Sequence, residues 1–284
     1  MIEIATFYHQ LLSGVTEKGL TPDEAMDEIY AHGITKVDVN SDYLLEEEPE
    51  HFAKKLEEHG IRIVSVHGIV ACDVASEKSF EDSVAEMKRR MHLAKRAGSE
   101  FFMIVPSKAD SFCEDDYDKY VNGVLALIKE ITAYGKEIGI QATVENFSRR
   151  DFPYTSFEGI ERILKENPDI RYTYDSGNYV LAGFNEIVGI KLFYDKTVYA
   201  HLKELKPVDY QTPYLWDDVY YSKPPFGDGI VKNFEAVEYM IERGYDGVFA
   251  VELYDNENVF DNTLISADLL KEKIEQIKKE VGIE

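Results

Sequence analysis

Residues 140–178 read IQATVENFSRRDFPYTSFEGIERILKENPDIRYTYDSGN, and they predict a strand, a helix and a second strand. A β-rich run opens the stretch, a helical pattern from Ser156 to Asn167 follows, and a second β-rich run comes after it. A carboxylate closes each run, since Glu145 ends the first and Asp175 ends the second. A polar group that closes a β-rich run recurs elsewhere in the chain.

The same alternation of strand and helix patterns continues on both sides of this unit. We expect strands at residues 2–7, 36–39, 61–67, 101–105, 140–144, 170–174, 197–200 and 247–251. We expect helices at residues 21–33, 49–60, 80–98, 117–139, 156–167, 184–193, 231–244 and 264–281. Eight such units, with no linker between them, predict an α/β protein with a single (β/α)₈ TIM barrel over residues 1–284.

The composition argues against two classes of partner. The 31 basic and 54 acidic residues give a formal net charge of -23, which repels nucleic-acid phosphates and anionic membrane surfaces.

Cys72 and Cys113 have no paired metal-binding spacing, and we expect both to be reduced thiols. Without a signal segment or an apolar run of about 18 residues, the sequence predicts a soluble, cytoplasmic protein. A homodimer is only the expectation from base rates.

Four acids and bases close consecutive strands of the predicted barrel. They are Glu145, Asp175, His201 and Glu252. The carboxyl ends of barrel strands open into one mouth, where active sites are built. Three carboxylates and one imidazole suit a divalent ion such as Mn²⁺ or Mg²⁺ better than a thiolate site would. We therefore predict a mononuclear metal site with positions left for water or substrate oxygens.

The motifs around these residues resemble those of the sugar phosphate isomerase/epimerase superfamily with the xylose-isomerase-like TIM barrel. The motifs are Val144-Glu145-Asn146, Tyr174-Asp175-Ser176-Gly177-Asn178, His201-Leu202-Lys203-Glu204, Phe226-Gly227-Asp228-Gly229 and Val251-Glu252-Leu253. The resemblance implies one bound divalent ion, Mn²⁺, Mg²⁺ or Co²⁺ with Zn²⁺ as an alternative, held by Glu145, Asp175, His201 and Glu252. It also implies that Glu145 and Glu252 are the acid and base of a ketose 3-epimerase acting on a sugar or sugar phosphate.

The chemistry of such a site agrees with this function. A metal ion that holds a ketose carbonyl and the neighbouring hydroxyl stabilises the enediolate left when the adjacent proton departs. One carboxylate can take this proton while the other returns a proton to the opposite face. The sequence leaves open which of the two glutamates begins as the base.

Three further residues are candidate substrate contacts. His67 ends the third predicted strand and could hydrogen-bond a substrate hydroxyl, although a structural histidine bonded to backbone groups is an alternative. Lys203 could supply a point charge for an oxyanion or phosphate, or could be a solvated lysine. Asn178 stands where some members of the resembling family have a substrate-binding or metal-binding histidine.

The stretch from Leu205 to Asp228 is too long for an ordinary connection inside a compact domain, and it is rich in proline and aromatic residues. We interpret it as a functional lid. Trp216 within it could stack on a sugar, or could simply pack against the barrel rim.

Other functions within and beyond the resembling family remain open at this point. An inosose-type dehydratase would use the same enolate chemistry, and its product would lose water. A sugar-binding barrel without turnover is a third hypothesis. An apurinic endonuclease is disfavoured, because strand four ends Val105-Pro106-Ser107 without histidine and because the net charge opposes DNA binding.

Overall fold

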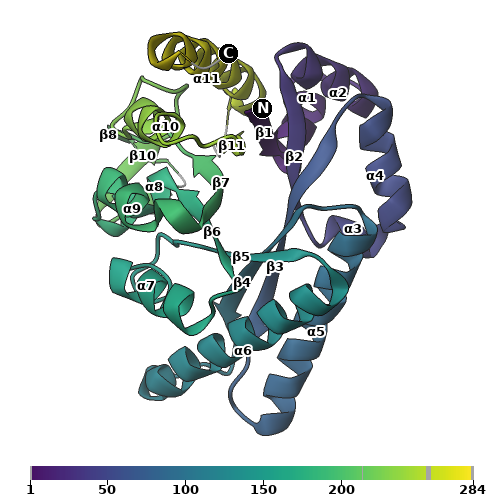
Figure 1. Cartoon of the computed structure of the whole chain (residues 1–284), viewed down its shortest axis with the longest axis vertical. Helices are drawn as coiled ribbons and strands as arrows, with labels where there is room; N and C mark the ends of the chain where they lie inside the picture. Colours follow the sequence, from purple (N-terminus) through teal and green to yellow (C-terminus); the bar gives the residue numbers. More distant parts are fainter. Residues whose placement is uncertain (1, 213, 254–256, 283–284) are drawn as a thin grey trace.

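The computed structural model describes residues 2–212, 214–253 and 257–282 of the chain. Within these ranges, eight parallel strands form a closed barrel whose order follows the sequence (Figure 1). The strands are β1 (Glu3–Phe7), β2 (Ile34–Asn40), β3 (Arg62–Cys72), β4 (Phe101–Lys108), β5 (Gln141–Glu145), β6 (Arg171–Asp175), β7 (Thr197–Leu202) and β11 (Val248–Val251). Strand β11 pairs with β1 and closes the circle. The predicted TIM barrel is confirmed.

Helices form an outer layer around the barrel (Figure 1). They are α1 (Tyr8–Lys18), α2 (Pro22–Ala31), α3 (Tyr43–Glu46), α4 (Pro49–Glu58), α5 (Glu77–Arg96), α6 (Tyr117–Ile138), α7 (Phe157–Glu166), α8 (Ser176–Ala182), α9 (Glu186–Phe193), α10 (Asn233–Ile241) and α11 (Val259–Val281). Two short 3₁₀ helices are η1 (Glu114–Asp116) and η2 (Tyr194–Lys196). Helix α2 begins with a capping box between Thr21 and Glu24, and Pro22 occupies its first helical position. Its local sequence therefore specifies where the helix begins.

Helix α1 is missing from the sequence prediction. Its N-cap residue, Phe7, has no capping side chain, and its first turn contains no acidic residue. Local start signals are therefore absent. At Gly14, an added Cβ would lie 2.7 Å from the ring of Phe260 in α11. Close packing against α11 rather than a cap stabilises this helix, as tertiary contacts commonly do.

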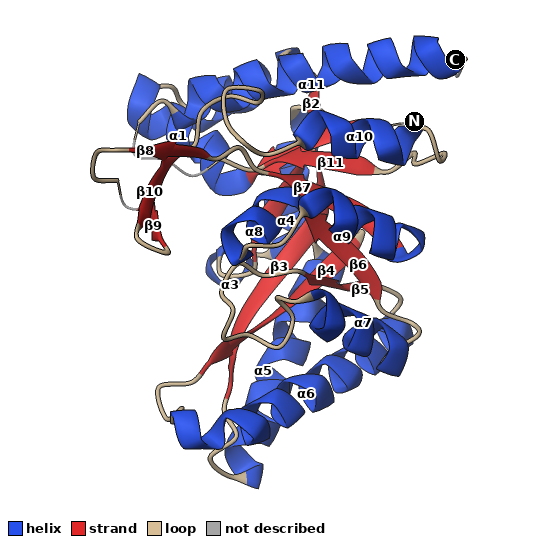
Figure 2. Ribbon diagram, turned by 90° about the vertical axis from the view of Figure 1, so that its left-hand side faces the viewer, coloured by secondary structure: helices blue, strands red, loops and turns tan. Residues whose placement is uncertain are grey.

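Strands β3 and β4 are longer than predicted. Their pairing continues from Ser65 and Phe101 to Cys72 and Lys108. Strand β5 ends at Glu145, whereas these two strands continue further in the same direction (Figure 2). They therefore form a wall beside the mouth of the barrel, and this wall supplies pocket residues that no strand-end pattern indicates.

The stretch from Leu205 to Asp228, predicted as a loop, contains a small antiparallel sheet. Its strands are β8 (Lys206–Val208), β9 (Tyr214–Trp216) and β10 (Val219–Ser222), in the order β8-β10-β9. Figure 2 shows this sheet standing apart from the barrel strands. Strands of three or four residues are too short for an alternating pattern to be recognised.

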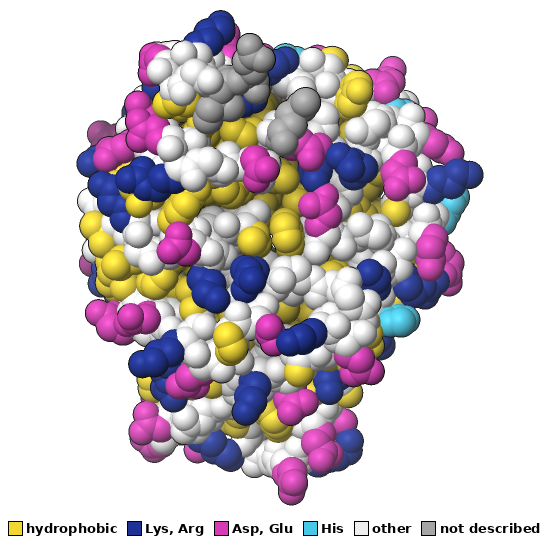
Figure 3. All heavy atoms as spheres, viewed as in Figure 1, with side chains coloured by type: hydrophobic (Ala, Val, Ile, Leu, Met, Phe, Trp, Pro, Cys, Tyr) yellow, Lys and Arg dark blue, Asp and Glu magenta, His cyan; other side chains and the backbone are white. Residues whose placement is uncertain are grey.

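The hydrophobic core has two parts. Most buried apolar side chains lie between the barrel and the helices, and a smaller cluster centred on Phe7, Tyr199 and Ala250 fills the barrel interior. On the face drawn in Figure 3, acidic and basic side chains are interspersed. No helix in the described ranges is long and apolar enough to cross a membrane.

Candidate metal-binding active site

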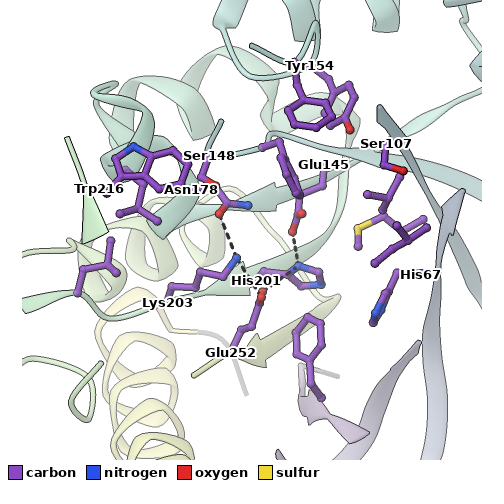
Figure 4. Close-up of a pocket in the computed structure, with 18 of the residues that line it drawn as sticks. His67, Ser107, Glu145, Ser148, Tyr154, Asn178, His201, Lys203, Trp216 and Glu252 are labelled. Atoms are coloured by element: carbon purple, nitrogen blue, oxygen red, sulfur yellow. Dashed lines mark hydrogen bonds and ion pairs between the residues drawn. The ribbon is translucent and has the colours of Figure 1, made fainter. Parts of the chain in front are cut away.

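A pocket of about 460 Å³ lies at the carboxyl ends of the barrel strands (Figure 4). Its lining includes most of the residues predicted from the sequence, namely Glu145, Glu252, His201, His67, Lys203, Asn178 and Trp216. Asp175, the remaining predicted residue, is fully buried beside the same cluster. The barrel therefore brings together residues that are separated by more than a hundred positions in the sequence.

Glu145, Asp175, His201 and Glu252 form a compact cluster in the pocket floor. Each offers one possible ligand atom, and these atoms all lie within 4.8 Å of one another. The Nδ1 atom of His201 lies 2.5 Å from Glu145 Oε1 and 3.3 Å from Glu252 Oε2. All four side chains are buried. Oxygen and imidazole donors converging in this way fit a hard or borderline divalent ion.

Asn146, which directly follows Glu145, connects the ends of two barrel strands through its side chain. Its side-chain oxygen accepts a hydrogen bond from the backbone N–H of Asp175, and its side-chain nitrogen donates to the carbonyl of Asp175, both at 2.9 Å. The hydroxyl of Tyr172 also donates to Asn146. Asn146 thus ties the ends of β5 and β6 together and holds Glu145 and Asp175 side by side.

Asp175 has two tasks, one for each carboxylate oxygen. Its Oδ1 accepts a hydrogen bond of 2.7 Å from the backbone N–H of Asn178 and caps α8. Its Oδ2 lies 2.6 Å from the ammonium of Lys203. Helix α8, like α1 and α3, is absent from the sequence prediction, which assigns Asp175 to the metal site rather than to a helix cap.

Lys203 is buried in the cluster rather than solvated. Its Nζ lies 2.9 Å from Glu252 Oε1 and 3.1 Å from Asn178 Oδ1, in addition to its contact with Asp175. Burial lowers the pKa of Lys203, but the charges of Asp175, Glu252 and Glu145 outweigh this effect and raise that pKa above its ordinary value. The side chain therefore carries a positive charge beside the pocket floor.

The charges of this region favour the binding of a cation. Four carboxylates, of Asp38, Glu145, Asp175 and Glu252, gather around two cationic side chains, Lys203 and His201. Burial raises the pKa of Asp175, Lys203 lowers it, and the charges of Glu145 and Glu252 raise it again, so that it lies above its ordinary value. Burial lowers the pKa of His201, but the neighbouring carboxylates raise it well above its usual range. A divalent ion among these carboxylates would reduce the repulsion between their negative charges.

Asp38 is a site residue that the sequence prediction does not contain. It lies within β2 and is fully buried, with Oδ1 at 2.6 Å from Nδ1 of His67 and Oδ2 at 3.5 Å from Nε2 of His201. The available signal was a single acidic residue between Val37 and Val39 in an apolar strand. His67 faces the pocket as predicted, and its partner is this carboxylate rather than the backbone.

Glu204, directly after Lys203, organises the chain that leads to the small sheet. Its carboxylate accepts backbone N–H bonds from Leu205 and Val231 at 3.1 Å and from Gly227 at 2.9 Å. At Gly229, an added Cβ would lie 2.3 Å from the carbonyl oxygen of Leu205. Close backbone packing at the base of the segment therefore explains the second glycine of the Phe-Gly-Asp-Gly motif.

The wall opposite the charged cluster is mostly apolar. Ile69, Met103 and Val105 come from the long strands β3 and β4, and Phe147 and Phe152 come from the connection after β5. Trp216, at the end of β9, also lines the pocket (Figure 4). A pocket with charged ligands on one side and apolar side chains on the other can hold a small polar substrate in a fixed orientation.

The barrel and its buried cluster define a class of protein, and comparison with known proteins agrees. A family model described as a xylose isomerase-like TIM barrel matches residues 26–280, and the chain therefore belongs to this family. Among curated proteins, none matches the chain.

Three solved structures illustrate the shared fold. A D-tagatose 3-epimerase-like protein aligns with a TM-score of 0.76 at 17% identity, over 98% of this chain and 99% of that chain. The IOLI protein, solved with a binding zinc atom, aligns with a TM-score of 0.69 at 17% identity, over 98% and 97%. The 3-keto-D-glucoside 4-epimerase YcjR from E. coli aligns with a TM-score of 0.69 at 15% identity, over 96% and 98%. Identities this low establish similarity of fold alone.

Proposed function

We propose that this protein is a divalent-metal-dependent isomerase or epimerase of carbohydrates, and specifically a ketose 3-epimerase. The observation that carries the proposal is the buried cluster of Glu145, Asp175, His201 and Glu252 at the floor of a substrate-sized pocket. Membership of the xylose isomerase-like family and the epimerases among the similar structures support it. The proposed ion is Mn²⁺, Mg²⁺ or Co²⁺, with Zn²⁺ as an alternative.

Glu145 and Glu252 are the proposed acid and base. Both line the pocket, and Figure 4 shows their side chains reaching His201 from different sides. One carboxylate accepts the proton from the carbon beside the ketose carbonyl, and the other delivers a proton to the opposite face. An ion held by the four-residue cluster would stabilise the negative charge of the enediolate.

The proposal assigns substrate contacts to His67, Lys203, Asn178 and Trp216, all of which line the pocket. Lys203 also holds Asp175 and Glu252 in place through its ammonium. Asn178 in turn accepts a hydrogen bond from Lys203 and donates one of 3.0 Å to the carbonyl of Asn146. These two residues thus position the carboxylates as well as facing the substrate.

The described lining favours an uncharged sugar over a sugar phosphate. Its cations besides the histidines are Lys203, which contacts two carboxylates, and Lys223. A phosphate group is usually bound by several positive or N–H donors. The apolar wall suits the C–H face of a free ketose instead.

Deuterium uptake from D₂O tests the function directly. Pentuloses, hexuloses, their phosphates and inosose are incubated with the Mn²⁺-loaded protein, and exchange at the carbon beside the carbonyl is followed by NMR. We expect metal-dependent exchange into a ketose, with a loss of at least about 100-fold in Glu252→Gln, the scale of a general acid or base. Glu81→Gln, on the exposed surface of α5, is the matched control and should retain full exchange.

The products separate the possible outcomes. An epimer keeps the mass of its substrate, whereas the product of an inosose-type dehydratase loses water. Exchange confined to inosose with loss of water would replace the epimerase proposal by a lyase. No exchange in any substrate, with metal bound, would favour a sugar-binding barrel without turnover.

A further inference from the structure

Two histidines on opposite sides of the barrel share one buried carboxylate. Asp38 Oδ1 lies 2.6 Å from Nδ1 of His67, and Asp38 Oδ2 lies 3.5 Å from Nε2 of His201. His67 comes from β3 and His201 from β7, which are not neighbours in the barrel. One side chain of β2 therefore connects a residue that faces the pocket with a candidate metal ligand.

Asp38 faces a different nitrogen on each ring, Nδ1 of His67 and Nε2 of His201. A neutral imidazole that donates from one nitrogen has its lone pair on the other. In His67 the donor toward Asp38 is Nδ1, so Nε2 is left to accept a hydrogen bond from a substrate hydroxyl. In His201, Nε2 faces Asp38 at 3.5 Å and Nδ1 is hydrogen-bonded to Glu145, so Nδ1, once its proton is lost, is the nitrogen that would bind an ion in the cluster.

Packing prevents either ring from turning easily. The ring of Phe7 lies 4.9 Å from that of His201 and 5.8 Å from that of His67, centroid to centroid. The ring of Tyr199 contacts His201 edge-on at 4.6 Å. Asp38 and His201 are fully buried, and the side chain of His67 is only 12% exposed. Water has little access to replace the carboxylate as a partner of these rings.

We propose that Asp38 is a positioning residue that sets the tautomer and orientation of both His201 at the metal site and His67 at the substrate. The inference rests on the proposed function, because it assigns the two rings to metal and substrate. A carboxylate behind a metal-binding histidine makes that ring a better ligand. Asp38 would act on the metal site through Oδ2 and His201, and on the substrate through Oδ1 and His67.

Asp38→Asn is the variant that tests this inference. It keeps the size of the side chain but replaces one acceptor oxygen by a donor NH₂ group and removes the charge. The matched control is Asp27→Asn, because Asp27 Oδ1 also lies 2.6 Å from a histidine Nδ1, that of His59, on the exposed surface of α2. Circular dichroism establishes that both variants are folded.

The first readout is metal affinity, measured by calorimetry with Mn²⁺ and by the visible spectrum of bound Co²⁺. We expect Asp38→Asn to weaken binding by about 10–100-fold, the usual effect of removing such a partner. Asp27→Asn should leave the affinity unchanged. Equal affinities in Asp38→Asn and the wild type would overturn the assignment to His201.

The second readout is the tautomer of His67, from ¹⁵N NMR of the histidine-labelled, metal-free protein. We expect the Nδ1–H form in the wild type and a shift toward the Nε2–H form in Asp38→Asn. His67→Gln identifies the signal by its loss. An unchanged His67 spectrum in Asp38→Asn would overturn the assignment to His67.

Neither readout requires a substrate, so the inference and the proposed function fail separately. A wild-type protein that binds metal but exchanges no proton contradicts the function alone. Unchanged metal affinity and His67 tautomer in Asp38→Asn contradict the role of Asp38 alone.

Discussion

Individual residues in this protein differ in chemistry according to how deeply the barrel buries them. Lys203 and Asp175 illustrate this. Burial disfavours the charged form of each side chain, and the two are paired, with Lys203 Nζ 2.6 Å from Asp175 Oδ2. The two cysteines give a simpler contrast, since no catalytic role is assigned to either. Cys72 ends β3 and is 1% exposed, whereas Cys113 is exposed.

The two thiols should react at very different rates. Burial raises the pKa of Cys72 to about 12, with a smaller contribution from the charge of Asp73, so almost no thiolate is present at pH 8. We expect an aromatic disulfide reagent to modify one thiol of the native protein quickly and the second only after unfolding. Cys113→Ser should abolish the fast phase, and Cys72→Ser should leave it intact. A fast phase that survives in Cys113→Ser would contradict the burial of Cys72.

At the scale of elements, the small sheet β8-β10-β9 brings an aromatic side chain to a pocket made mostly by the barrel and the connections after its strands. Trp216 ends β9, and the next residue, Asp217, lies 2.8 Å from a guanidinium nitrogen of Arg150 in the connection after β5. This ion pair is more than half exposed and contributes little energy. The sheet is therefore joined to the barrel at its tip by a weak contact and at its base by Glu204.

Replacing Trp216 should affect the substrate and leave the metal site unchanged. We expect Trp216→Ala to lower kcat/KM by about 10–100-fold, since a lost aromatic anchor costs on the order of 2 kcal/mol. Calorimetry should give the same metal affinity as in the wild type. Tyr210→Ala is the control, because Tyr210 is an exposed aromatic residue of the same segment and does not line this pocket. Full activity in Trp216→Ala would show that the ring only packs on the rim.

For the whole molecule, the candidate metal ligands join distant parts of the chain. Glu145, Asp175 and His201 belong to β5, β6 and β7, and Glu252 directly follows β11, which closes the barrel against β1. The four ligands lie close together only in the folded barrel, so an ion that needs all four would bind the folded protein and not the unfolded chain. Its binding free energy should therefore add to the stability of the fold.

Metal should raise the unfolding temperature. At an ion concentration of 100 times Kd, binding contributes about 2.7 kcal/mol, which corresponds to several degrees in a protein of this size. Calorimetry with and without Mn²⁺ measures the shift, and a chelator should reverse it. We expect a much smaller shift in Glu252→Gln and the full shift in Glu81→Gln. Equal shifts in all three proteins would place the bound ion outside this cluster.

The local pattern of the chain was sufficient for the barrel and for the four candidate ligands. The eight barrel strands, and the polar residues that close four of them, could be recognised from nearby residues, and parallel strands joined by helices put all their carboxyl ends at one mouth. Glu145, Asp175, His201 and Glu252 were found for this reason, as was the pocket-facing position of His67.

The local pattern could not predict contacts between segments that are far apart in the chain. Asp38 lies inside a strand rather than at its end, and only the closed barrel brings it between His67 and His201. The burial of Lys203, the packing of α1 on α11 and the sheet built on Trp216 likewise depend on partners far away in the chain. Local propensity carries no information on such distances, so the tertiary structure alone decided which charges meet and which nitrogen of each histidine faces the pocket.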